Sequence, residues 1–92
     1  MADIELTRSH SMGLDDGRDA VERVAQQLED DIGVDYEWKE NSLLFDGDAA
    51  DGRIDVAANT VEILVNLSAF LRPMQSQIKA EAERYLDRHF QS

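Results

Sequence analysis

Carboxylates are the most numerous side chains in this chain that could do chemistry, and some of them form short clusters. The densest cluster holds Asp46, Asp48 and Asp51. Several carboxylate oxygens on a tight turn suit a hard cation such as calcium. An EF-hand loop also needs a third oxygen ligand at its fifth position and glycine at its sixth, where this chain has Ala50 and Asp51. We therefore predict an exposed acidic loop over 46–52 and no metal site.

The two histidines lack the spacing of a metal site. His10 and His89 lie near opposite ends of the chain, so neither an HxxxH nor an HExxH motif is present. His10 shares the alternation of Ile4 and Leu6, and we expect it to cap the edge of the core beside the first helix. His89 is expected in the last helical turn, where the helix dipole favours a cation. Both predicted roles are structural.

General acid–base and nucleophilic chemistry have no recognisable set of residues. Adjacent acids such as Asp15 and Asp16 are expected on the exposed surface of a helix, whereas a general acid needs a buried carboxyl with a shifted pKa. The sequence contains no cysteine, no GxSxG elbow, no GxGxxG turn and no P-loop. We predict a protein that is not an enzyme, has no catalytic residues and needs no cofactor. A hydrolase or isomerase of acyl thioesters is a further alternative, which the missing nucleophile disfavours.

Two aromatic residues raise a binding alternative. Tyr36 and Trp38 share one face of a predicted strand, and aromatic rings line ligand clefts as well as cores. A meander that curves around a long C-terminal helix is also the arrangement of helix-grip lipid-binding folds. Under this interpretation Tyr36, Trp38, Met74 and Ile78 line a ligand cavity. Under the other interpretation the two aromatic residues only pack in the core.

Charge and exposed apolar residues bear on the partners. The 92 residues carry 20 acids and 9 bases, a net charge of −11, and this acidity disfavours nucleic acid as a partner. The last third is nearly neutral, because residues 63–92 hold 3 acids and 4 bases. Alternation places Leu44, Ala57 and Leu64 on the solvated face of the sheet. We predict that these three residues form a contiguous patch and a homodimer interface that strengthens with salt.

The elements that position these residues are predicted by hydrophobic period. Strands are expected near 4–8, 34–39, 43–45, 54–56 and 61–67, and helices over 14–32 and 73–89. Ser11 is the expected N-cap of the first helix and Gly33 its stop. The short connections exclude parallel pairing within the meander. We predict a single α+β domain over 1–92, in which an antiparallel sheet of about five strands, in the order β-α-β-β-β-β-α, packs on two helices as two layers.

The sequence also bears on location. The N-terminal residues lack the basic and apolar regions of a signal peptide. The densest apolar run, over 61–71, is interrupted by Glu62, Asn66 and Ser68. Without cysteine, disulfide frameworks are excluded. We expect a cytoplasmic protein without a membrane span.

Two motifs resemble a known family. R-x-H-x-x-G-L occupies residues 8–14, and L-x-P-x-x-x-x-I occupies residues 71–78. With these motifs, nearly the whole chain resembles the polyhydroxyalkanoic acid system family, small bacterial proteins associated with polyester storage granules. The resemblance implies a non-enzymatic accessory protein that binds a granule surface or a granule-associated protein, and it supplies no catalytic residue. A carrier of a small acyl or hydroxyacyl ligand is the alternative function.

Overall fold

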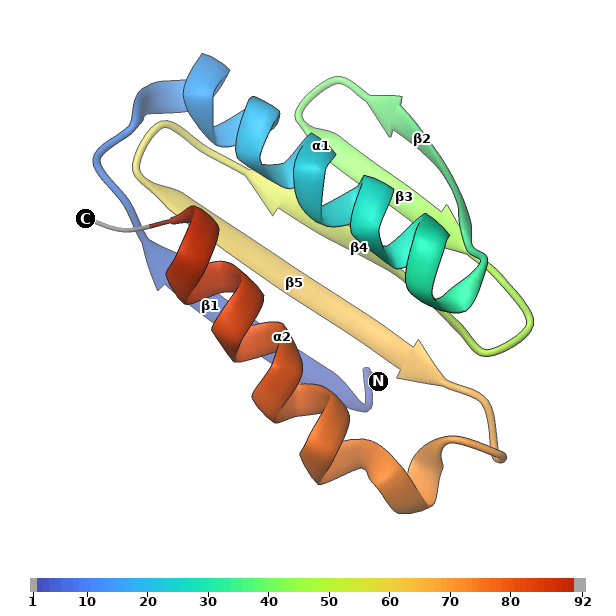
Figure 1. The fold of residues 1–92 in the computed structure, drawn as a ribbon. Helices are drawn as coiled ribbons and strands as arrows, with labels where there is room; N and C mark the ends of the chain where they lie inside the picture. Colours follow the sequence, from blue (N-terminus) through green and yellow to red (C-terminus); the bar gives the residue numbers. More distant parts are fainter. Residues whose placement is uncertain (1, 91–92) are drawn as a thin grey trace.

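The computed structural model describes residues 2–90 as one antiparallel sheet with both helices on one face (Figure 1). The elements are β1 (Ile4–Ser9), α1 (Gly13–Ile32), β2 (Asp35–Lys39), β3 (Ser42–Asp46), β4 (Ala50–Val56), β5 (Thr60–Leu67), the 3₁₀ turn η1 (Arg72–Met74) and α2 (Gln75–His89). The predicted α+β class and element order are confirmed. Strands β2 to β5 form the meander, and β1 joins it beside β5, giving the order β1-β5-β4-β3-β2.

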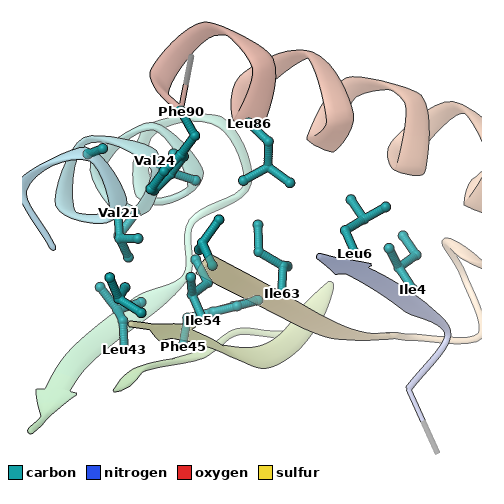
Figure 2. Close-up of a cluster of buried hydrophobic side chains, with 14 of the residues drawn as sticks. Ile4, Leu6, Val21, Val24, Leu43, Phe45, Ile54, Ile63, Leu86 and Phe90 are labelled. Carbon is teal, nitrogen blue, oxygen red and sulfur yellow. The ribbon is translucent and has the colours of Figure 1, made fainter. Parts of the chain in front are cut away.

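The inner face of the sheet and one stripe of each helix form the core, as Figure 2 shows. One row of paired residues across the inner face consists of Leu6, Ile63, Ile54 and Leu43. Above this face lie Val21 and Val24 of α1 and Leu86 of α2 (Figure 2). Alternate residues of the strands and residues three or four apart in the helices therefore face one another and form a single apolar core.

The N-terminal cap of α1 differs from the prediction, whereas its C-terminal end agrees with it. The N-cap is Met12 without a side-chain cap, so the prediction of Ser11 as N-cap is wrong. Gly33 ends the helix as expected: its φ is 70°, and its N–H donates to the Glu29 carbonyl at 3.0 Å. Glycine adopts this left-handed conformation without the steric cost that a Cβ brings.

The predicted acidic loop over 46–52 is shorter than expected. β3 extends to Asp46 and β4 begins at Ala50, so Asp51 and Gly52 are strand residues. Gly52 pairs with Phe45, and a Cβ at Gly52 would lie 2.9 Å from the Phe45 ring and 2.0 Å from the Leu64 carbonyl oxygen. Glycine is needed here because the backbone of β5 and an aromatic ring fill its side-chain space, whereas the sequence pattern alone resembles a turn.

His10 connects three parts of the fold. It is 4% exposed, and its Nε2 lies 3.1 Å from the Ala57 carbonyl and 3.2 Å from the Thr60 carbonyl. Its Nδ1 accepts the Met12 N–H at 3.3 Å, a pattern that fits the tautomer protonated on Nε2. The Phe90 ring lies 5.3 Å away between centroids. The predicted structural role of His10 is confirmed.

The rest of the R-x-H-x-x-G-L motif also joins elements. Arg8 forms ion pairs with Glu83 at 3.6 Å and Asp87 at 3.5 Å, which link β1 to α2. Leu14 packs against the core from the first turn of α1.

His89 is the last residue of α2, and its side chain lies outside the described part. Within residues 2–90, neither helix is both long and apolar enough to cross a membrane.

Candidate functional site

A groove lies between α1 and α2 with the sheet as its floor. Its volume is about 140 Å³, close to the roughly 150 Å³ of an engineered apolar cavity that binds benzene. We call it the interhelical groove. Its walls are Val24, Leu28 and Ile32 of α1 and Ile78 and Ala82 of α2.

Helical spacing explains why these side chains face one another. The α1 residues recur every four positions, as do Ile78 and Ala82, so each helix turns one apolar stripe towards the other. Below them the floor includes Ala50 of β4 and Val65 of β5. Ala50 and Ala82 are the short side chains of this lining, and longer side chains at these positions would fill the space.

The polar part of the lining is acidic or neutral. It consists of Asp31, Glu81 and Tyr85, and the Tyr85 hydroxyl donates to Asp31 Oδ2 at 3.0 Å. Burial and this hydrogen bond raise the pKa of Tyr85 above its ordinary value. The groove lining, taken within residues 2–90, contains neither lysine nor arginine nor histidine. A ligand anion would therefore meet carboxylates without a compensating cation.

Three exposed apolar side chains belong to segments at one end of the sheet. Ile32 is 39% exposed, Phe70 86% and Met74 46%. Ile32 ends α1 and lines the groove, Phe70 precedes the lining residue Leu71 in a turn, and Met74 closes η1. Figure 1 shows the end of α1 and the connection from β5 to α2 at the same end of the sheet. We call Ile32, Phe70 and Met74 the apolar end.

The predicted cavity residues separate into two groups. Ile78 lines the interhelical groove. Tyr36, Trp38 and Met74 do not belong to its lining: Met74 is exposed, and the two aromatic residues lie on β2, the edge strand farthest from α2 in the sheet order. The structure therefore does not bring these three together with Ile78 in this groove, because α1 as well as α2 covers the inner face. Ala82 also lines the groove but was not among the predicted residues; its small side chain within a bulky stripe was the available signal.

Tyr36 and Trp38 instead bind a carboxylate of α1. Trp38 Nε1 donates to Glu22 Oε1 at 2.8 Å, and the Tyr36 hydroxyl donates to Glu22 Oε2. Burial raises the pKa of Glu22, but hydrogen bonds from Tyr36, Trp38 and Gln26 outweigh it and hold the pKa below its ordinary value. The Arg18 guanidinium lies 4.7 Å from the Trp38 ring centroid. Both carboxylate oxygens of Glu22 accept hydrogen bonds from β2, so these hydrogen bonds link α1 to β2.

The predicted dimer residues do not form one patch. Leu44 and Leu64 are half-buried on the outer face and flank Arg53, with which each is paired across the strands. Ala57 lies in the turn after β4, beyond Asp55, which is ion-paired to Arg53 at 3.0 Å. The contiguous patch expected from alternation is therefore interrupted by a charged pair. Dimerisation through this face stays a prediction.

The comparisons with known proteins bear on the whole fold. No curated protein and no solved structure matches the chain. The family model described as putative polyhydroxyalkanoic acid system protein (PHA_gran_rgn) matches residues 4–90. This match begins at the first residue of β1 and ends directly after α2, so it includes the full sheet, both helices and the interhelical groove. The chain therefore belongs to the family of putative polyhydroxyalkanoic acid system proteins.

Proposed function

We propose that this chain is a non-enzymatic accessory protein of the polyhydroxyalkanoate system and that it binds the surface of the polyester granule. The observation that carries the proposal is the apolar end, where Phe70 is 86% exposed at the tip of a turn. Exposed large apolar side chains at one end of a fold favour contact with an apolar surface. The non-enzymatic part rests on the sequence, which has no cysteine and no GxSxG elbow.

The distribution of charge supports this orientation. Phe70 and Met74 belong to residues 63–92, which hold 3 acids and 4 bases, whereas the whole chain has a net charge of −11. An approach led by Phe70 and Met74 desolvates no carboxylate of residues 63–80, which contain no acid, whereas Ile32 directly follows the exposed Asp30 and Asp31. Burying the Phe70 ring would contribute about 1.5 to 3 kcal/mol.

Fractionation of granule-forming cells of the source organism tests the proposal. We expect the protein in the granule fraction, and we expect its deletion to change polymer content or granule size. A protein that stays wholly in the supernatant, with a deletion strain whose granules are unchanged, would contradict the proposal.

The interhelical groove favours a second candidate function, a carrier of a small acyl or hydroxyacyl ligand. The specific observation is a volume of about 140 Å³ with a mainly apolar lining. Ala82→Leu should fill the groove and abolish stabilisation by a short ester in a thermal-shift assay. Ala80→Leu is the matched control, because Ala80 is exposed on the same helix and does not line the groove. Equal stabilisation of both variants would place the ligand elsewhere.

A further inference from the structure

We infer that the interhelical groove binds an uncharged hydroxyalkanoate ester, such as the hydroxyl end of a polyester chain, and rejects the free acid. This inference rests on the second proposed function, the ligand carrier, and names its ligand class. Three features of the groove support it: its volume, the charge of its lining and the hydrogen-bonding capacity of its polar residues.

The volume limits the size of the ligand. A groove of about 140 Å³ compares with a cavity of roughly 150 Å³ that holds benzene, so about six to eight heavy atoms fit. One short hydroxyacyl unit with its ester group has this size. A long fatty acyl chain does not fit within this volume.

The charge of the lining disfavours anions. Asp31 of α1 and Glu81 of α2 both belong to the lining and are solvent-exposed, so a ligand carboxylate or phosphate would find like charge on each helix. The lysine and arginine residues of α2 and η1 do not belong to the groove lining. One of them, Arg72, is ion-paired with Asp3 at 3.9 Å. An ester removes the ligand charge while keeping its apolar carbon atoms.

The hydrogen-bonding capacity of the lining favours a ligand hydroxyl. Carboxylates accept hydrogen bonds and cannot donate them when ionised. The Tyr85 hydroxyl already donates to Asp31 Oδ2 at 3.0 Å, so its oxygen is left as an acceptor. The polar residues Asp31, Glu81 and Tyr85 thus present acceptors, which match the O–H of a hydroxy ester and not the oxygens of a plain ester.

Titrations with three small probes test the inference. Binding is measured from the NMR amide shifts of the full chain. The probes are methyl hydroxybutyrate, hydroxybutyrate as the free acid at neutral pH, and methyl butyrate, which lacks the hydroxyl. We expect methyl hydroxybutyrate to bind at least tenfold more tightly than the free acid and several-fold more tightly than methyl butyrate. The shifted amides should include those of Leu28 and Ala82.

Charge variants locate the selectivity. Glu81→Lys should strengthen binding of the free acid at least tenfold, whereas Asp30→Lys, an equal change of charge at an exposed residue outside the groove, should leave the ratio of the probes unchanged. Equal effects of both variants would assign the selectivity to net charge and overturn the inference.

The failures of the two proposals can be distinguished. If the wild-type chain binds the free acid as tightly as the ester, the carrier function stands and the inference is overturned. If none of the probes binds, the carrier function itself fails and the inference fails with it. If probe binding is lost as protein concentration rises, a second copy of the chain occupies the groove, which also overturns the inference.

Discussion

At the residue scale, the hydrogen bonds of Glu22 determine how Tyr36 titrates. Tyr36 donates its hydroxyl hydrogen to a carboxylate that also accepts from Trp38. This hydrogen bond, together with burial, raises the pKa of Tyr36 from 10.0 to about 12. Because the raised pKa favours the neutral phenol in the fold, the contribution of Tyr36 to stability is full below pH 10 and is lost as pH rises through about 12.

The lowered pKa of Glu22 makes stability depend on pH in the opposite direction. Its ionised form is favoured in the fold, so its contribution is present above its ordinary pKa of 4.5 and is lost as pH falls below it. We predict that Glu22→Gln returns the pKa of Tyr36 towards 10.0, since the amide carries no charge. Ultraviolet absorbance of tyrosinate in a Tyr85→Phe background measures this. Tyr36 titrating near 10.0 in the chain with Glu22 intact would contradict the described hydrogen bond.

At the scale of elements, α2 has two halves with different roles. Its C-terminal half contributes Leu86, 1% exposed, and is followed directly by Phe90, 4% exposed. Its N-terminal half contributes Ile78, which is half-buried and borders the interhelical groove. The single apolar stripe predicted from sequence is thus core at one end of the helix and groove wall at the other.

We predict different stability costs for the two halves. Leu86→Ala should destabilise the chain by about 2 to 5 kcal/mol, whereas Ile78→Ala should cost less than about 2 kcal/mol because Ile78 is only half-buried and loses less apolar burial. Urea unfolding measures both. A cost for Leu86→Ala below about 0.5 kcal/mol, as for a surface residue, would contradict the packing of α2 on the sheet.

The comparison with the sequence prediction is instructive at this scale. Period-two and period-3.6 patterns predict the elements because they reflect which side chains are buried. They misplace the start of β4, because glycine among acids resembles a turn, whereas the space beside Gly52 is filled by Phe45 across the β3–β4 hairpin and by the β5 backbone. The groove could not be predicted in full, because the gap between the apolar stripes of two helices depends on where both helices pack; of the four predicted cavity residues, Ile78 borders this groove.

At the scale of the whole molecule, the outer face of the sheet is acidic, whereas Phe70 and Met74 lie in a segment, 63–80, that contains no acid. Acids outnumber bases on the outer face of the sheet, which carries Glu5, Asp35, Glu37, Asp46, Asp51, Asp55 and Glu62 against Lys39 and Arg53. Two such faces repel each other at low ionic strength. The apolar end, by contrast, offers Phe70 from the nearly neutral third of the chain. In the proposed binding to a granule, this end would meet the apolar surface and the acidic outer face of the sheet would stay in water.

Binding of the purified chain to polyester granules stripped of protein tests this central claim most directly. Co-sedimentation should be measured for the wild type, for Phe70→Ser and for Ala69→Ser, the exposed neighbour in the same turn as matched control. Phe70 is 86% exposed, so its replacement leaves the fold intact. We predict that Phe70→Ser weakens binding about tenfold or more, from the lost burial of one ring, and that Ala69→Ser binds as the wild type does. Binding of Phe70→Ser equal to that of the wild type, or a wild type that does not sediment with granules, would contradict it.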